Sequence, residues 1–239
     1  LYVSDGTVMG TTVLLDINSA GNDNVGNVVL INGVAYFAAD DGTHGRELWV
    51  SDGTVGGTRM LADLNPSGGS DPSGFVLSNG KTYFNAWDSS KGRELYVTNG
   101  TTNGTVSLGD LNPYGDSSPD RFTAAGLKTV FRAYDAQRGW ELWVTDGTVG
   151  GTQILADLNP RGDSDPQNIT AVNGKAIFSG YDGSPSEGGR GREAWVTDGT
   201  VAGTQMIEIN TSATINSGNS DPSNFTALGR RILFSAYNS

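Results

Sequence analysis

The stretch ELWVSDGTVGGTRMLADLNP at residues 47–66 returns almost unchanged as ELWVTDGTVGGTQILADLNP at residues 141–160. Its central Asp-Gly-Thr turn signal recurs through the chain, once with Asn in place of Asp. The five copies begin at Asp5, Asp52, Asn99, Asp146 and Asp198, at intervals of 47, 47, 47 and 52 residues. A fixed period of this size is typical of solenoids, propellers and other repeat arrays.

Each repeat contains four short apolar segments that predict four β-strands. In residues 122–160 they read FTAAG, KTVFRAYD, ELWVTDG and TQILADL, rich in β-branched and aromatic residues and bounded by turn residues. Asn-Gly pairs at 32–33, 79–80 and 173–174 predict type I′ hairpin turns between the first and second strands. In the D-G-T-x-x-G-T element, the Asp is expected to close an Asx-turn and the glycines to adopt left-handed conformations.

The two ends of the chain carry complementary halves of a repeat. The sequence begins with a third and fourth strand and ends with a first and second strand. We predict an all-β fold: one closed five-bladed β-propeller over residues 1–239, with four antiparallel strands per blade. Residues 1–17 should pair with residues 225–237 in one sheet, because closure removes exposed strand edges. The first strands should pack Phe75, Phe122, Ile169 and Phe225 between sheets.

The recurring segments ELWVSDGT, ELWVTDGT and EAWVTDGT resemble the ELWxxDGT repeat family of bacterial proteins. The resemblance covers essentially the whole chain and implies a secreted or surface-exposed repeat protein that is often large. It supplies no catalytic motif or ligand. The start of the chain inside a motif, at Leu1, also predicts that it is part of a longer protein.

Composition argues against several functional classes. The net charge is −11, which disfavours a nucleic-acid partner, and no apolar run is long enough to cross a membrane as a helix. The chain has no Cys and one His, His44, in an expected loop. Five-bladed glycosidases need convergent carboxylates on their innermost strands, but the first strands here carry no acid and only Asp120 lies just upstream of one. The sequence therefore predicts no enzyme, with a glycan-active hydrolase as an alternative.

Two sets of acids recur at fixed places. One set precedes the third strand and is interpreted as structural, tying a loop to its neighbour, with a ring of ligand contacts as the alternative: Glu47, Glu94, Glu141 and Glu193. The other ends the fourth strand and would suit a Ca²⁺ ring: Asp16, Asp63, Asp110, Asp157 and Glu208. No D-x-D-x-D-G loop is present, so neither a metal nor another cofactor is predicted.

An aromatic residue followed by Asp or Asn ends the second strand in four repeats. The pairs are Trp87-Asp88, Tyr134-Asp135, Tyr181-Asp182 and Tyr237-Asn238. A ring beside an acceptor suits sugar binding, whereas packing between blades is the structural alternative. We therefore predict a noncatalytic extracellular or cell-surface binding or structural module. It would be a monomeric ring within a larger chain, with a polysaccharide or surface protein as partner. A lectin with repeated sites at blade edges is the main alternative.

Overall fold

The computed structural model describes residues 1–184, 186, 188–209 and 219–238. Contacts divide the chain into two compact units, residues 1–107 and residues 108–239, which are described separately. Among the described residues there is no α-helix, and none forms a helix that could cross a membrane. The chain is all-β, as predicted.

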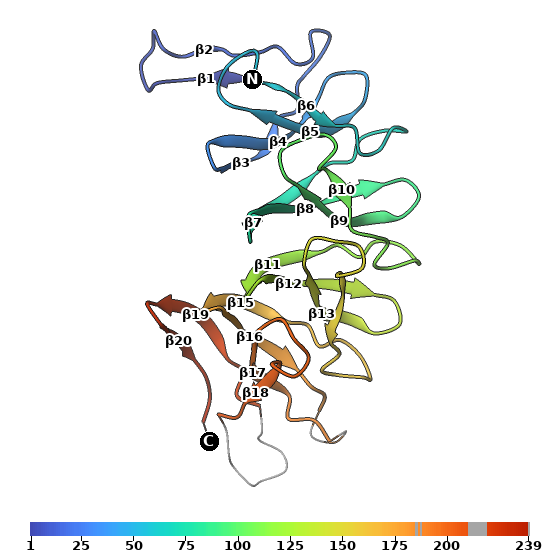
Figure 1. Cartoon of the computed structure of the whole chain (residues 1–239), viewed down its shortest axis with the longest axis vertical. Coiled ribbons are helices and arrows are strands. Elements are labelled where there is room, and N and C mark those ends of the chain that lie inside the picture. The colour runs from blue at the N-terminus through green and yellow to red at the C-terminus, as the bar shows by residue number, and fades with distance from the viewer. Residues whose placement is uncertain (185, 187, 210–218, 239) are drawn as a thin grey trace. The chain divides into compact units, whose positions relative to one another are not determined.

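Residues 1–107 contain one two-stranded and two four-stranded antiparallel sheets (Figure 1). The two-stranded sheet pairs β1 (Tyr2–Val3) with β2 (Thr12–Val13). The first complete sheet contains β3 (Gly26–Ile31), β4 (Val34–Asp40), β5 (Arg46–Ser51) and β6 (Arg59–Ala62). The second contains β7 (Ser73–Ser78), β8 (Lys81–Asp88), β9 (Gly92–Thr98) and β10 (Val106–Ser107).

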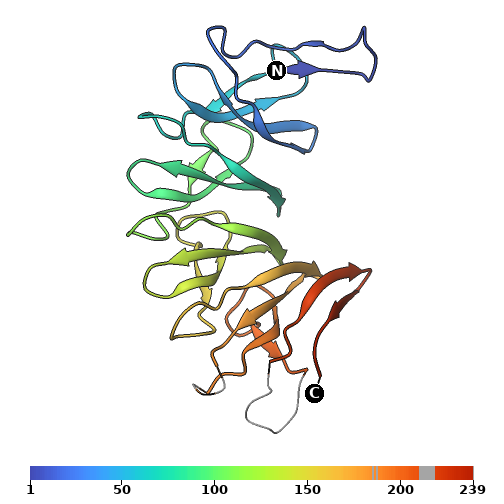
Figure 2. The ribbon, with the colours of Figure 1, turned by 180° about the vertical axis from the view of Figure 1, so that it is seen from behind.

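Residues 108–239 contain two complete sheets and one two-stranded sheet, which Figure 2 shows from behind. The complete sheets contain β11 (Asp120–Ala125), β12 (Lys128–Asp135), β13 (Gly139–Thr145) and β14 (Gln153–Ala156), then β15 (Gln167–Val172), β16 (Lys175–Tyr181), β17 (Arg192–Thr197) and β18 (Gln205–Ile207). The chain ends with the hairpin β19 (Ser223–Leu228) and β20 (Arg231–Ser235). In every complete sheet the strands follow chain order. The prediction of four antiparallel strands per repeat is therefore confirmed for four repeats.

The turns between first and second strands match the type I′ prediction. Asn32 and Gly33 have φ values of 52° and 82°, and the pair at 173–174 has 49° and 72°. Both central residues are left-handed, as this turn requires, and Asn and Gly adopt that conformation at low cost.

The Asp-Gly-Thr turns between third and fourth strands are closed by the Asp side chain. In residues 146–151 the Oδ1 atom of Asp146 accepts hydrogen bonds from Thr148 N at 2.9 Å and Thr148 Oγ1 at 2.7 Å. Gly147 has a φ of 85°. A Cβ on Gly151 would lie 2.1 Å from that Oδ1 atom, so the second glycine makes room for the Asx-turn. Asp5, Asp52, Asn99 and Asp198 make the same bonds.

A bulge interrupts the pairing of the first and second strands in all five hairpins, and the sequence did not predict it. The register shifts between Asp120 and Thr123 in β11 and at the equivalent place in the other first strands. One residue there is left-handed in each hairpin: Asn27, Gly74, Arg121, Asn168 and Asn224. A residue of this conformation bends the strand and increases its twist.

Neighbouring sheets pack face to face within each unit. Between the first two complete sheets, Tyr36, Leu48 and Val50 pack with Phe75 and Phe84. The rings of Phe75 and Phe84 lie 5.3 Å apart. In the other unit, Leu142 and Val144 pack with Phe178, and Ile169 contacts this cluster. Phe75 and Phe122 are buried, and the half-buried Ile169 packs in the cluster between its two sheets, as predicted for these residues. Phe225 in the last hairpin is half-buried.

Successive first strands lie side by side in both units. Asn27 Nδ2 donates to Pro72 O at 3.2 Å, and Thr123 Oγ1 donates to Ile169 O at 3.0 Å. Four-stranded meanders with adjacent first strands and face-to-face packing form a propeller-like arrangement.

Candidate binding site

Two kinds of loop carry the candidate residues. The connecting loops join the fourth strand of one sheet to the first strand of the next. The loops between the second and the third strand within one sheet are called the second loops. The described connecting loops are residues 14–25, 63–72, 108–119 and 157–166. The described residues of the second loops are 41–45, 89–91, 136–138, 182–184, 186 and 188–191. A recurrent hydrogen bond joins each second strand to the preceding connecting loop, for example Tyr134 N to Ser117 O at 2.8 Å.

The glutamates that precede the third strand are buried and bind the connecting loops. Glu47 accepts hydrogen bonds from Leu64 N at 2.8 Å, Ser70 N at 2.8 Å and Ser70 Oγ at 2.6 Å. Glu141 and Glu193 accept the same pair of bonds from the N and Oγ atoms of Ser164 and Ser220. Glu94 is equally buried. These carboxylates tie loop to strand and lie out of reach of a ligand.

Burial dominates the ionisation of these glutamates. It raises the pKa of Glu141 to about 8, although the bonds from Ser164 favour the ionised form. Burial also raises the pKa of Glu47 and of Glu193, against hydrogen bonds from Ser70 and from Ser220 respectively. Glu47, Glu141 and Glu193 are therefore pH-sensitive parts of the fold.

The acids predicted beside the aromatic residues mainly shape the second loops. Asp88 Oδ1 accepts bonds from Ser90 N at 2.7 Å and Ser90 Oγ at 2.6 Å. Asp135 Oδ1 accepts from Gln137 N at 2.8 Å and Arg138 N at 3.0 Å, and Asp182 Oδ1 accepts from Arg190 N at 2.6 Å. In each of these carboxylates, one oxygen, Oδ1, is thus used to shape the loop.

His44 lies in the same kind of loop. Its Nδ1 atom is 2.7 Å from Asp41 Oδ2, and the hydrogen bond raises the pKa of His44 and, with backbone bonds, lowers that of Asp41. The side chain is exposed and pairs with its own loop, so it has no arrangement suited to a nucleophile.

The four aromatic residues differ in exposure. Trp87 and Tyr237 are exposed, whereas Tyr134 and Tyr181 are half-buried. Tyr134 packs edge-on against Trp140, with ring centroids 5.5 Å apart. Asn238 is exposed. The four aromatic residues therefore differ in their surroundings from repeat to repeat, and their binding role stays a prediction.

The structure shows an ion-pair cluster that sequence reasoning missed. Arg132 binds Asp120 through Nε at 2.9 Å and Nη2 at 2.7 Å, and it binds Asp165 through Nη1 at 2.8 Å. Its guanidinium lies 4.5 Å from the centroid of the Trp140 ring. Arg192 joins Asp165 from the next sheet at 2.9 Å. Asp120 is thus held as the partner of an arginine, not as a free acid.

The acids at the ends of the fourth strands do not assemble into a metal site. Within the described ranges, no group of three or more His, Asp or Glu side chains is placed to hold a metal ion. Asp63 and Asp157 each have one buried oxygen without a hydrogen-bond partner. Burial raises the pKa of Asp157. Glu208 pairs instead with Arg190.

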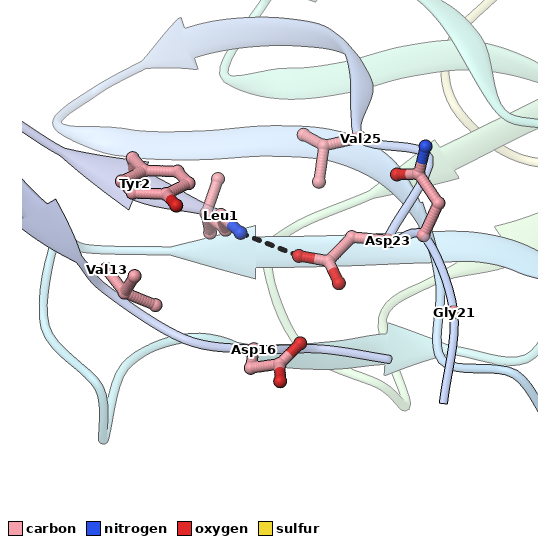
Figure 3. Close-up of a pocket in the computed structure, with 8 residues that line it drawn as sticks. Leu1, Tyr2, Val13, Asp16, Gly21, Asp23 and Val25 are labelled. Atoms are coloured by element: carbon pink, nitrogen blue, oxygen red, sulfur yellow. Dashed lines mark hydrogen bonds and ion pairs between the residues drawn. The ribbon is translucent and has the colours of Figure 1, made fainter. Parts of the chain in front are cut away.

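A pocket of about 720 Å³ lies beside the two-stranded sheet β1–β2 (Figure 3). Its lining includes Tyr2, Val13, Asp16 and Asp23, and the amino group of Leu1 binds Asp23 Oδ2 at 2.6 Å. A smaller, more apolar groove of about 290 Å³ lies between β1 and the sheet β3–β6. Both hollows flank the two-stranded sheet β1–β2.

A further small pocket, of about 210 Å³, lies between the connecting loop 108–119 and the second loop 136–138. Asn112, Pro113, Tyr114, Asp135, Ala136 and Gln137 line it. Asp135 was predicted as a binding residue, but its aromatic neighbour in this pocket is Tyr114 and not Tyr134. Tyr114 stands at a loop position where the other repeats have no aromatic residue, so its place in the repeat is a signal present in the sequence.

The chain matches no family model and no curated protein. It is similar in structure to one of two prolyl endopeptidases, with 10% identity and a TM-score of 0.54 over 99% of this chain and 36% of that one. It is also similar to TolB from Acinetobacter baumannii, with 16% identity and a TM-score of 0.45 over 86% of this chain and 47% of that one. A third similar structure is an α-L-arabinofuranosidase from Clostridium thermocellum, with 14% identity and a TM-score of 0.33 over 88% of this chain and 80% of that one.

The chain spans less than half the length of the first two of these proteins. At such low identity, the similarity to the prolyl endopeptidase concerns the fold alone. Together with the four-stranded sheets, it places the chain among propeller-like all-β proteins.

Proposed function

We propose that the chain is a noncatalytic binding or structural module, built as a closed five-bladed β-propeller of the ELWxxDGT type. It would act within a larger protein outside the cell or on its surface. The main support is that the recurring acidic side chains are engaged in contacts within the fold. The glutamates bind connecting loops, the Asp-Gly-Thr acids close turns, and Asp120 and Asp165 pair with arginines.

A hydrolase needs a different arrangement of acids. A glycosidase requires two carboxyl groups facing one space about 5–10 Å across, with one of them able to donate a proton. In the part of the chain that the structure describes, Glu47, Glu141 and Glu193 have raised pKa values and bind N–H and hydroxyl groups of the connecting loops. The acids of the Asp-Gly-Thr turns are held in those turns, and Asp120 and Asp165 are held in ion pairs. This pattern supports a scaffold whose loops bind without chemistry.

Ring closure is supported by the faces of the two half-sheets. Tyr2 is 71% exposed, whereas Trp49, at the same place in a complete sheet, is 8% exposed. Phe234 is 36% exposed, whereas its equivalent Phe131 is fully buried. Each two-stranded sheet therefore exposes apolar side chains whose equivalents are buried in the complete four-stranded sheets.

The register of the complete sheets defines the proposed pairing. Phe37 lies opposite Trp49, and Phe131 lies opposite Trp143. The repeat then places Phe234 of β20 opposite Tyr2 of β1. The apolar groove between β1 and β3–β6 would receive the side chains of β19 and β20.

Amide hydrogen exchange tests the closed ring. We expect the amides of β1 and β20 to exchange as slowly as those of β5 and β12, because pairing would bury their hydrogen bonds. Fast exchange limited to β1, β2, β19 and β20 would contradict closure. For the function, incubation with a panel of polysaccharides should give retention on some of them without release of reducing ends. Release that survives repurification and is lost in Asp120→Asn would instead support a hydrolase.

A further inference from the structure

Four connecting loops contain the same β-turn but present different side chains from it. The N–H of the fourth turn residue donates to the carbonyl of the first, from Gly21 to Asn18, Gly68 to Asn65, Gly115 to Asn112 and Gly162 to Asn159, at 2.9–3.0 Å. The third residue of these turns is Ala20, Ser67, Tyr114 and Arg161. The scaffold is constant and its tip varies, which is the organisation expected of a recognition surface.

The turn that carries Tyr114 is rigid. Pro113 fixes the backbone at the second turn position, where its φ angle suits the turn. Asn112 is buried, and its Nδ2 atom donates to Asp116 O at 3.1 Å. Its Oδ1 atom accepts from Ala136 N at 3.2 Å, which joins the turn to the second loop 136–138. The aromatic ring is therefore presented at little further cost in backbone entropy.

The pocket beside this ring has polar groups that are still able to bind. Tyr114 is 75% exposed, and Gln137 is exposed at the other side of the pocket. Asp135 Oδ1 is occupied by two backbone N–H groups, whereas its Oδ2 atom pairs with Arg138 Nη1 at the longer distance of 3.4 Å, and the side chain is 14% exposed. An exposed ring, an acceptor oxygen and an amide thus surround a space of about 210 Å³.

At the equivalent place in the preceding repeat, side chains join the turn to the second loop. There Ser67 Oγ donates to Asn65 Oδ1 at 3.0 Å and lies at hydrogen-bond distance, 2.9 Å, from Ser89 Oγ. Ser67 therefore provides an internal control: it stands at the same position of the same turn but has no aromatic ring, and its hydroxyl is bonded within the loops.

We propose that the pocket formed by Tyr114, Asp135 and Gln137 binds a neutral sugar residue of a polysaccharide. The C–H face of a pyranose would stack on the Tyr114 ring, and its hydroxyl groups would bond to Asp135 Oδ2 and the Gln137 amide. The carboxylate of Asp135 and the net charge of −11 disfavour a uronic acid. The site rests on the proposed binding function, but it involves only residues 108–138 and does not require the propeller to be closed.

Saturation-transfer NMR tests this site, since a shallow pocket is expected to bind in the millimolar range. The probes are cellotetraose and laminaritetraose, which are neutral, and tetragalacturonic acid, which is anionic. We expect transfer to at least one neutral probe and none to the acid. Tyr114→Ala should weaken binding about tenfold or more and Gln137→Ala several-fold, whereas Tyr114→Phe and the control Ser67→Ala should leave it unchanged.

The folding of Tyr114→Ala is checked by its melting temperature, which should stay within about 1 °C of the wild type because the side chain is exposed. The proposal is overturned if neither neutral probe binds, if binding persists in Tyr114→Ala, or if the acid binds as well as the neutral probes. Binding to other polysaccharides that is insensitive to Tyr114 would overturn this site while leaving the proposed binding function intact.

Discussion

Glu141→Gln should make the stability of the protein less dependent on pH. Burial raises the pKa of Glu141 to about 8, from 4.5 for a free glutamate. Between these values the unfolded chain has lost the proton that the folded chain still holds. The stabilisation from this group is therefore complete below about pH 4.5 and is lost as the pH rises towards 8.

The expected size follows from the linkage between proton binding and folding. One group in this state lowers the free energy of unfolding by roughly 1.4 kcal/mol for each pH unit. From pH 5 to pH 7 the loss from Glu141 is then at most about 2.8 kcal/mol. The pKa of about 8 already includes the hydrogen bonds from Ser164, which favour the ionised form. Glu47 and Glu193 have pKa values raised in the same direction and add to the slope in the wild type.

Urea unfolding at pH 5, 6 and 7, followed by tryptophan fluorescence, measures the effect. Glutamine keeps the shape of the side chain and an acceptor oxygen for Ser164. We expect Glu141→Gln to lose less stability than the wild type as the pH rises. The control is Glu208→Gln, at an exposed acid, which should retain the wild-type slope. Equal slopes for Glu141→Gln and the wild type would refute the role assigned to the buried carboxyl.

Two further substitutions test the local structure. Gly151→Ala should destabilise the protein by about 2–4 kcal/mol in thermal melts, because its Cβ would displace Asp146 from the Asx-turn. The control Gly150→Ala should be nearly neutral, because a Cβ there meets nothing within 4 Å. Equal effects would show that the close approach is not limiting. Arg132→Ala should lower the free energy of unfolding by about 2–3 kcal/mol in urea titrations, since it breaks partly buried ion pairs with two acids. Arg138→Ala, which removes a more exposed arginine from an ion pair, should lower it by less than about 0.5 kcal/mol. A neutral Arg132→Ala would indicate that the cluster does not stabilise the fold.

The features that the sequence predicted well depend on residues close together in the chain. The Asn-Gly turns and the Asx-turn of Asp146 are local, and four strands per repeat followed from turn spacing. The bulge was missed because its left-handed position holds Asn27 and Gly74 in some repeats but Arg121 in another, and arginine does not indicate that conformation.

The site was predicted less well because it depends on contacts between loops. In other repeats an arginine, such as Arg93 or Arg192, lies at the start of the third strand. In the repeat of the ion-pair cluster, Trp140 occupies that position, and the arginine, Arg132, lies on the second strand instead. Only the fold shows that this exchange keeps a guanidinium beside the connecting loop. In the same way, the neighbour of Asp135 in its pocket is Tyr114, which lies 21 residues earlier in the chain.

Closure of the ring is the central claim, and a cross-strand disulfide tests it most directly because the chain has no other cysteine. Thr129 lies opposite Thr145, and Ala176 lies opposite Thr197, so the repeat places Ile232 opposite Ser4. With Ser4→Cys and Ile232→Cys, we predict an intramolecular disulfide under mild oxidation, seen as a loss of free thiols in a monomer. Val3→Cys with Ile232→Cys places the two thiols on opposite faces and should not crosslink. Free thiols in the first pair, or crosslinks only between molecules, would contradict the closed five-bladed ring.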